Sequence, residues 1–456
     1  MKRSKLPAGL GQAVRVCLFS LVLLVLVIPA ADAAAIRYWV KRYNGPADDV
    51  DSGAAVAFDK FGNVYVAGRS TAGGSGSDYL VIKYGPNGGV KWMKRYDGTG
   101  GNWDGARGVA VDDNGNVYVT GRSFGPGTHG DYATIKYDAA GRQKWVKRYT
   151  SAGYYDDGAM DIALDNNGNV IVTGFSTGPG SAFDYVTIKY GPDGSQKWLK
   201  RYDGPGNAGD VARGVAVDAN NNVYVTGASN GVSSSWDYAT VKYSPTGVQL
   251  WVKRWNSPFN ASDGATDIAM DDYNFAYVTG YTYRGGSNSD YMTIKYNRNG
   301  TIKWAKRYNG PANGADVAWA IDVYLNGVFV TGASLGRGTD TDYATIRYFR
   351  GGDRTWVRRY SGPARKADVA NAIVAENGRV YVTGYSTGAA TSGDYLTIAY
   401  GGGGGLKWAN RYNGPASAFD QGNAVGVCPV TGNVYVTGGS GGNGTKSDFA
   451  TIKYAP

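Results

Sequence analysis

The sequence predicts an all-β protein: an eight-bladed β-propeller of four-stranded blades, closed by pairing its N-terminal strand with the last blade. The first observation is a period of 52 or 53 residues, marked by eight tryptophans: Trp39, Trp92, Trp145, Trp198, Trp251, Trp304, Trp356 and Trp408. The second is composition: of 456 residues, 70 are glycine, 36 tyrosine and 12 tryptophan, which favours turns and strands over helices. Four strands in roughly 40–50 residues match a propeller blade, whereas a solenoid would need shorter repeats and polar capping units.

Residues 1–33 have the pattern of a secretory signal peptide. Four basic residues precede an apolar run over residues 17–28, and the small-residue triplet Ala31-Asp32-Ala33 follows Pro29. This order is that of an n-region, an h-region and an A-x-A cleavage site. A membrane anchor is the alternative, but it needs ~20 apolar residues and no later segment offers a second span. We expect cleavage after Ala33, a propeller domain over residues 34–456, and a periplasmic, cell-surface or secreted location.

Charge and side-chain chemistry exclude several classes of function. The formal net charge of +10 falls to +7 after cleavage, because four Lys/Arg and one Asp lie within residues 1–33. This balance could favour anionic polymers, but the basic residues are not clustered as in nucleic-acid-binding motifs. Cys428 is the only cysteine outside the signal, so no internal disulfide is possible, and the single histidine, His129, leaves little from which to build a zinc site. We expect no metal and no cofactor.

One unit predicts the strands of every blade. Short segments rich in β-branched and aromatic residues, separated by Gly, Pro, Asn and Asp, are expected at Asp161–Leu164, Asn169–Thr173, Asp184–Tyr190 and Lys144–Tyr149, from the channel outward. The small residues of the first segment suit the crowded axis, and the W-x-K-R-Y segment suits the rim. Since the chain begins on an outermost strand, Trp39–Tyr43 is expected to pair with the strand that ends at Tyr454 and so close the ring.

These repeats resemble a known family. The core G-x-A-x-D-x-x-G-N-V-Y-V-T-G, followed by S-D-Y-x-x-I-K-Y and x-G-x-x-x-W, is similar to the bacterial β-propeller repeats called SBBP, with a looser similarity to NHL-type repeats. The resemblance covers essentially everything after the predicted signal. It implies an extracytoplasmic propeller, often a surface-associated module, and it supplies no catalytic residues.

An aspartate precedes the innermost strand in every unit, and we call these eight the lead aspartates. They are expected in the loop that enters this strand, on the same face as the aspartates of the D-Y pairs. The structural interpretation is that each carboxylate accepts backbone N–H bonds or pairs with the Lys-Arg of the outer strand. The functional interpretation is an acidic ring that binds cations or sugar hydroxyls at the channel mouth. The set is Asp51, Asp104, Asp157, Asp210, Asp263, Asp316, Asp368 and Asp420.

Other candidates are weaker. Asp112 begins a D-D-N-G-N segment with calcium-loop spacing, but it lacks the distal Glu and fits a hairpin turn better. Trp103 and Trp236 fall in variable loops of the same face, where an exposed aromatic could stack on a sugar ring or contact a partner. His129 is expected to be a solvated loop residue.

We expect an exported, monomeric, non-catalytic binding or scaffolding module whose partner is an envelope protein or a glycan, without nucleic-acid binding or membrane insertion of the mature chain. The alternatives are a lectin-like carbohydrate-binding propeller and a polysaccharide-active enzyme that uses carboxylates of this face. Residues that differ from the repeat distinguish the lectin alternative from the enzyme alternative. A multivalent lectin should keep equivalent pockets in many blades, whereas an enzyme should concentrate unique residues in one or two adjacent blades.

Overall fold

The computed structural model describes residues 35–74, 76–127, 129–152, 155–178, 180, 182–284 and 287–456. The predicted signal peptide, residues 1–33, lies outside the described residues. Within the described ranges, no helix is both long and apolar enough to cross a membrane.

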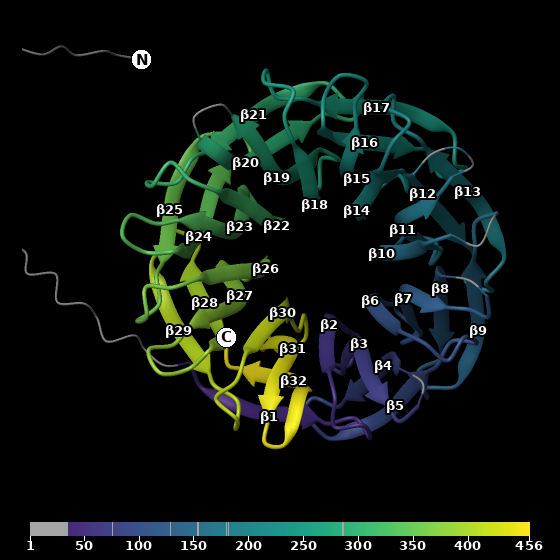
Figure 1. Cartoon of the computed structure of the whole chain (residues 1–456), viewed down its shortest axis with the longest axis vertical. Coiled ribbons are helices and arrows are strands. Elements are labelled where there is room, and N and C mark those ends of the chain that lie inside the picture. The colour runs from purple at the N-terminus through teal and green to yellow at the C-terminus, as the bar shows by residue number, and fades with distance from the viewer. Residues whose placement is uncertain are drawn as a thin grey trace, which may run out of the picture.

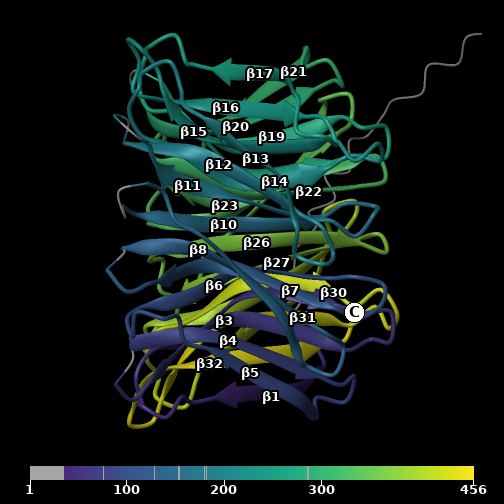
Figure 2. The ribbon, with the colours of Figure 1, turned by 90° about the vertical axis from the view of Figure 1, so that its right-hand side faces the viewer.

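Eight four-stranded antiparallel sheets form a closed ring around a central channel (Figure 1). The strands run from one face of the ring to the other (Figure 2). The innermost strands are β2 (Asp51–Phe58), β6 (Asp104–Val111), β10 (Asp157–Leu164), β14 (Asp210–Val217), β18 (Gly264–Met270), β22 (Asp316–Tyr324), β26 (Asp368–Glu376) and β30 (Asp420–Val427). The second strands are β3 (Val64–Ala72), β7 (Val117–Phe124), β11 (Val170–Thr177), β15 (Val223–Asn230), β19 (Ala276–Arg284), β23 (Gly327–Leu335), β27 (Arg379–Thr387) and β31 (Val434–Gly442).

The outer half of each blade carries the D-Y and W-x-K-R-Y segments. The third strands are β4 (Gly76–Tyr84), β8 (Gly130–Tyr137), β12 (Phe183–Tyr190), β16 (Trp236–Tyr243), β20 (Ser287–Tyr296), β24 (Thr341–Phe349), β28 (Gly393–Gly401) and β32 (Thr445–Tyr454). The outermost strands are β5 (Val90–Tyr96), β9 (Gln143–Tyr149), β13 (Gln196–Tyr202), β17 (Gln249–Trp255), β21 (Ile302–Tyr308), β25 (Arg354–Tyr360), β29 (Leu406–Tyr412) and β1 (Arg37–Tyr43). The predicted strand order is therefore confirmed. We number the blades one to eight from the blade that begins with β2.

The ring closes as the phase of the repeat predicts. Strand β1 pairs with β32 in the last blade, whose order is β1-β32-β31-β30. The pairing is antiparallel and places Trp39 opposite Lys453 and Tyr43 opposite Phe449. Because the first strand completes the last sheet, the outer edge of this blade is occupied.

The innermost strand starts earlier than the sequence suggested. In the third blade it begins at Asp157, four residues before the predicted Asp161, and β11 extends to Thr177 instead of Thr173. The extension follows from pairing of Asp157 with Ser176 and Gly158 with Phe175. A Cβ at Gly174 would lie 2.0 Å from the Gly158 carbonyl oxygen, so glycine is what lets the two backbones approach here.

Aromatic side chains hold neighbouring blades together. The D-Y tyrosine is buried and its hydroxyl donates to a carbonyl of the next blade, as Tyr132 does to Val186 at 2.9 Å. The outer-strand tryptophan also reaches the next blade, where the Trp198 indole N–H donates to the Pro245 carbonyl at 3.1 Å. The prediction that these aromatics pack between blades is confirmed, and the hydrophobic core is divided among the interfaces between blades.

Candidate functional site

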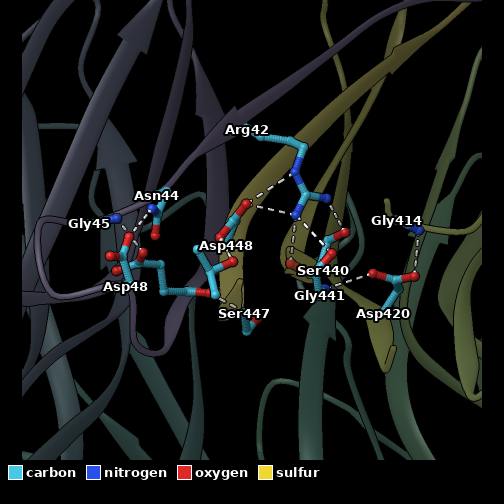
Figure 3. A network of polar contacts seen from close by, with 12 residues as sticks. Arg42, Asn44, Gly45, Asp48, Gly414, Asp420, Ser440, Gly441, Ser447 and Asp448 are labelled. Atoms are coloured by element: carbon cyan, nitrogen blue, oxygen red, sulfur yellow. Dashed lines mark hydrogen bonds and ion pairs between the residues drawn. The ribbon is translucent and has the colours of Figure 1, made fainter. Parts of the chain in front are cut away.

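The lead aspartates belong to the framework of the blades. All eight side chains have no exposed surface, and each accepts the backbone N–H of the residue six positions earlier at 2.5–2.8 Å. Asp420, for example, accepts from Gly414 and from Gly441 (Figure 3). Burial raises the pKa of each carboxyl, to about 6 for Asp210. Each therefore ties the loop that enters its blade to the start of the innermost strand.

Two expectations about these aspartates need correction. They do not lie in a loop, because seven of them open an innermost strand and Asp263 directly precedes one. They also do not form an exposed ring at the channel mouth, because each carboxylate is buried and accepts backbone N–H groups, as Asp51 does from Gly45 and Thr71. They do lie on the same face as the D-Y aspartates, as predicted, since Asp51 and Asp78 are both paired with Ser70. We call this face, which also carries the loops between second and third strands, the top face.

The arginines of the W-x-K-R-Y segments pair with the D-Y aspartates and not with the lead aspartates. In the fourth blade the Arg254 guanidinium lies 2.7 Å from the Asp237 carboxylate and donates to the Ser229 carbonyl at 2.8 Å. The same pair occurs in every blade: Arg42–Asp448, Arg95–Asp78, Arg148–Asp131, Arg201–Asp184, Arg254–Asp237, Arg307–Asp290, Arg359–Asp342 and Arg411–Asp394. These repeated charges are thus used within the blades.

The calcium-like segment is a hairpin turn, as predicted. The Asp112 carboxylate accepts the backbone N–H groups of Asn114 and Asn116 at 2.9 Å. Gly115 has a φ of +75°, which the turn requires and glycine adopts without strain.

Two groups of three aspartates each bring carboxylate oxygens within 4.8 Å of one another: Asp78, Asp97 and Asp104, and Asp184, Asp203 and Asp210. In each group the D-Y aspartate already pairs with an arginine, at 2.9 Å from Arg95 and 2.6 Å from Arg201. Because the D-Y carboxylate is paired with this arginine and the lead aspartate accepts backbone N–H groups, as Asp104 and Asp210 do from Gly98 and Gly204, we do not assign a metal to either group.

One position of the innermost strand carries a side chain whose size and charge vary from blade to blade. The third residue after each lead aspartate stands where the register with the second strand shifts, which marks a β-bulge. These bulge residues are exposed or half-buried, in contrast to the buried residue before each. In chain order they are Ala54, Arg107, Met160, Arg213, Thr266, Trp319, Asn371 and Asn423. The bulge position therefore gives the channel wall its chemical variety.

Some bulge residues fasten neighbouring blades. The Thr266 hydroxyl donates to the Ala318 carbonyl at 2.8 Å, and the Asn371 and Asn423 amides donate to carbonyls of the following blade at 2.9 and 2.7 Å. Arg107 and Arg213 make no hydrogen bond or ion pair to another part of the chain that the structure describes. Their guanidinium groups remain available to a ligand.

The main pocket of the top face lies at the channel mouth where the first and last blades meet. Its volume is about 490 Å³. Arg69, Trp103 and Arg107 provide its large side chains, Ser52, Gln421 and Asn423 add polar groups, and Gly53, Ala54, Gly105, Ala106 and Met160 complete the lining. We call it the mouth pocket. Strands of the first three blades and of the eighth meet there (Figure 1).

Positive charge is concentrated at the mouth pocket. Arg107 lies close enough to Arg69 and Arg122 that, together with burial, their charges lower its pKa below the ordinary arginine value. Arg122 is paired with Asp156, so part of this charge is neutralised. Among the described residues, Arg69 and Arg107 have no carboxylate partner.

Trp103 stands at the centre of this charged group. The Arg69 and Arg122 guanidiniums lie over its ring, at 5.7 and 5.9 Å from the ring centroid. The indole rests against Gly105, where a Cβ would lie 3.0 Å from the ring. The prediction that Trp103 lies in a top-face loop is confirmed, because it ends the loop before β6.

Two other candidates lie outside the mouth pocket. Trp236 is not a loop residue: it is half-buried and opens β16, because it pairs with Asn230 of β15. Its carbonyl accepts the Asp263 N–H of the next blade at 2.6 Å. His129 is exposed, one residue before β8, as expected for a solvated loop histidine.

A second, more apolar pocket faces the mouth pocket across the channel. Trp319, Tyr281 and Tyr283 form its aromatic wall, and its volume is about 270 Å³. Strands β19 and β22, which carry these residues, lie opposite β2 and β6 in the ring (Figure 1). The top-face mouth thus has a cationic side and an aromatic side.

Deeper in the channel wall are buried carboxylates that the sequence analysis did not single out. Burial raises the pKa of Asp161 to about 6. It raises that of Asp267 to about 7, where the nearby carboxylates of Asp161 and Asp322 add to the effect. Each accepts a backbone N–H from the next blade: Val215 donates to Asp161 at 2.8 Å and Ile321 to Asp267 at 2.9 Å. These carboxylates join blades.

Sequence reasoning identified Trp103 but missed Arg69 and Arg107. The signal was present, because the residue after the glycine of each second-strand motif is arginine only in the first two units: Arg69, Arg122, Phe175, Ala228, Tyr281, Ala333, Tyr385 and Gly439. In the sheet, each of these second-strand residues lies opposite the residue that follows a lead aspartate, as Arg69 lies opposite Ser52. Comparing variable positions inside otherwise constant strands would have found it.

Comparison with known families agrees with the repeat. Residues 39–74, 95–126 and 201–232 match the model of SBBP, described as a beta-propeller repeat. The chain contains SBBP repeats. The second and third matches include the innermost and second strands of the second and fourth blades, so the family model recognises the constant strands of these blades.

Other relatives are distant. An uncharacterized WD repeat-containing protein, L264, of Acanthamoeba polyphaga mimivirus is 28% identical over 111 residues, which cover 21% of this chain and 8% of that protein. The chain thus matches only a small part of this relative's length.

Among solved structures, the polysaccharide lyase Uly1 has a TM-score of 0.45 and 10% identity, with 88% of this chain and 89% of that chain covered. Drosophila Plexin A in complex with Semaphorin 1b has a TM-score of 0.44 and 8% identity, with 93% and 88% covered. YjhT has a TM-score of 0.34 and 14% identity, with 64% and 94% covered. Similarities of this size carry no information about function.

Proposed function

We propose that this SBBP propeller is an exported, non-catalytic binding module that acts at the cell envelope or outside the cell, and that it takes its ligand at the mouth pocket. The observation that carries the proposal is the departure from the repeat at the bulge position. The lead aspartate and the small residue two positions after it recur in every blade, whereas the bulge residue differs in size and charge around the ring. Arg107 at this position meets Arg69 from β3 of the first blade and Trp103 from the loop before β6 in one concave site.

The distribution of these residues favours a single site over a multivalent lectin. A lectin with repeated pockets would need the same side chains at the bulge position of many blades. Instead, Met160, Arg213 and Trp319 present an apolar, a cationic and an aromatic group at equivalent places. The cationic and aromatic sides of the mouth offer one ligand two different surfaces.

The chemistry of the mouth pocket favours binding over carboxylate-based cleavage. Its described lining includes two arginines and no carboxylate. Glycoside hydrolysis of the usual kind needs two carboxyl groups that flank the scissile bond, roughly 5–10 Å apart. The lead aspartates nearby are buried and accept backbone N–H bonds, so they are poorly placed for this task.

Export rests on the residues before the propeller, and cell fractionation tests it. The full-length gene product is expected in the extracytoplasmic fraction with a mass that corresponds to a chain starting after Ala33. A full-length protein that stays in the cytoplasm would refute export while leaving the binding site to be tested separately.

A glycan array combined with a pull-down from envelope extracts tests the binding site. The wild-type propeller is expected to retain a ligand that Trp103→Ala and Arg107→Ala lose. Arg142→Ala is the matched control, because Arg142 lies in the hairpin at the opposite face and its side chain is 78% exposed. Retention of the ligand by all three variants would place binding elsewhere. Sugar release from arrayed glycans would favour the enzyme alternative.

A further inference from the structure

We infer that the mouth pocket recognises an acidic saccharide: the Arg69 and Arg107 guanidiniums bind a carboxylate or sulfate group, and the Trp103 indole contacts the sugar ring. This inference rests on the proposed function, which places the ligand in this pocket, and it adds the chemical class of that ligand.

The first support is the contrast between two groups of arginines. The arginine of every W-x-K-R-Y segment has an aspartate partner, as Arg95 has Asp78 at 2.9 Å. Arg69 and Arg107 have none among the described residues, although they lie in the same region as the paired Arg122. Guanidinium groups held together without counter-charge repel one another, and an anionic ligand group would relieve this repulsion.

The second support is the effect of the neighbouring positive charges on the pKa of Arg107. Partial desolvation at the channel mouth and the charges of Arg69 and Arg122 lower its pKa while its side chain stays exposed to the channel, so its positive charge is held here at a cost. No hydrogen bond to the described chain compensates for that cost. Side chains that are unfavourable for folding yet placed in a concave site are typical of binding sites.

The third support is the shape and remaining chemistry of the pocket. A volume of about 490 Å³ lies in the range of small-molecule sites and is large enough for one or two sugar rings. The Ser52 hydroxyl, the Gln421 amide and the Asn423 amide oxygen can bond sugar hydroxyls, whereas the Asn423 amide nitrogen already donates to Ser52 and Gly53. The glycine floor at Gly53 and Gly105 keeps the pocket open, and the aromatic face of Trp103 suits the apolar face of a sugar. An acidic peptide would use the arginines but leave these hydroxyl and amide groups less well matched.

Calorimetry with defined oligosaccharides tests the inference. The probes are trigalacturonate, a sulfated galactose trisaccharide and maltotriose, which differ in the anionic group. We expect wild-type protein to bind at least one of the two acidic probes and to bind maltotriose much more weakly. The acidic probe that binds identifies the anionic group. Arg69→Ala and Arg107→Ala should each raise its Kd about tenfold or more, since each removes a charge-assisted hydrogen bond.

Arg213→Ala is the matched control. Arg213 is the equivalent bulge arginine two blades away, and it does not line the mouth pocket. Its removal should change the Kd less than about twofold, whereas an equal loss would mean that the general charge of the mouth binds the anion and would refute the pocket. Arg107→Ala should melt at the wild-type temperature or above it, because it removes a repelled charge. Loss of binding is then not a consequence of unfolding.

Other outcomes separate this inference from the proposed function. Binding of maltotriose as tight as that of the acidic sugars, with loss in Trp103→Ala alone, would keep the binding site and refute the acidic class. Hexaglutamate that competes as strongly as the acidic sugars would refute the saccharide class. Failure of both acidic sugars to bind would refute the acidic-saccharide inference alone. The mouth pocket as a binding site would be refuted as well only if Trp103→Ala and Arg107→Ala still retain the envelope ligands.

Discussion

The Arg42 guanidinium lies 2.7 Å from the Asp448 carboxylate, although 406 positions separate the two residues in the chain (Figure 3). Arg42 belongs to β1 and Asp448 to β32, so this ion pair joins the two ends of the chain. The same guanidinium donates to the Tyr412 hydroxyl of the preceding blade at 3.1 Å. One side chain thus completes the last blade and fastens it to its neighbour, with the contacts that Arg254 makes to Asp237 and Tyr202 inside the ring.

Arg42→Ala should therefore loosen ring closure. The substitution leaves the buried Asp448 carboxylate without its cation, and we expect the free energy of unfolding to fall by about 1–3 kcal/mol. Limited proteolysis should also cut near β1 faster. Arg148→Ala, which removes the equivalent contacts to Asp131 and Tyr96 inside the ring, should cost a similar amount without faster cleavage near the N-terminus. Unchanged stability and cleavage in Arg42→Ala would contradict this role.

Asp210→Ala should destabilise the propeller without affecting ligand binding. The Asp210 carboxylate accepts the backbone N–H groups of Gly204 at 2.6 Å and Asn230 at 3.0 Å, and both donors would lose their partner. The expected cost is about 1–3 kcal/mol in urea unfolding, with similar values for Asp157→Ala and Asp263→Ala. The exposed Asp113→Ala should stay within about 0.5 kcal/mol of wild type. A neutral Asp210→Ala that abolished ligand binding would show that the lead aspartates act at the site.

Asp267 should make stability fall as pH rises. Its pKa is raised from 3.8 to about 7, so between these pH values the folded chain holds a proton that the unfolded chain has released. The resulting stabilisation is complete below pH 3.8 and is lost as pH rises through about 7. Asp267→Asn removes this titration. Relative to wild type it should be more stable at pH 8 than at pH 4, by on the order of 2 kcal/mol.

The pH dependence is measured by urea unfolding of wild type and variant across this range. Asp113→Asn, which removes a carboxylate at an exposed turn position, is the control for the general effect of losing one surface charge. A constant difference between Asp267→Asn and wild type would mean that the pKa of Asp267 is the same in the folded and the unfolded chain.

Gly247→Ala should be more costly than its backbone conformation alone explains. Gly247 has a φ of +83°, and a Cβ there would lie 2.8 Å from the Trp198 indole of the preceding blade. Gly338 has a φ of +73° with no atom within 4 Å of such a Cβ, so Gly338→Ala measures the conformational cost, about 1–2 kcal/mol. Gly247→Ala should cost about 1–3 kcal/mol more in urea unfolding because it disturbs blade packing. Equal costs would show that the Trp198 contact adjusts freely.

The strands of the repeat could be predicted from local pattern because each strand alternates and each turn carries its own Gly, Asn or Asp. Even so, the predicted start of the innermost strand at Asp161 was late. The four residues before it, Asp157 to Met160, are too small and polar to read as a strand by themselves. They become one through pairing with β11, which a local pattern does not reveal.

The lead aspartates illustrate a second limit. Eight identical carboxylates on one face were consistent with either an acidic ring or a set of loop anchors, and the structural alternative included a pair with Lys-Arg. Only the burial of each carboxylate distinguishes the acidic ring from the set of loop anchors. From the sequence, Arg254 could pair with either the lead aspartate or the D-Y aspartate of its blade. The pairing of β16 with β17 places it next to the D-Y aspartate, Asp237.

The amino-acid sequence by itself determines the period of the repeat, the strand content and the number of blades, because short-range alternation and turn residues specify each strand. It also determines the pairing of β1 with β32, because the phase of the repeat specifies which two strands must meet. The mouth pocket does not follow in this way. Arg69 belongs to β3 of the first blade, whereas Trp103 and Arg107 belong to the loop before β6 and to β6 of the second. They meet only when these neighbouring blades pack at their final angle. A bulge then turns the Arg107 side chain out of the sheet toward the channel. Such placement depends on register and blade packing, which are long-range properties that no single segment encodes.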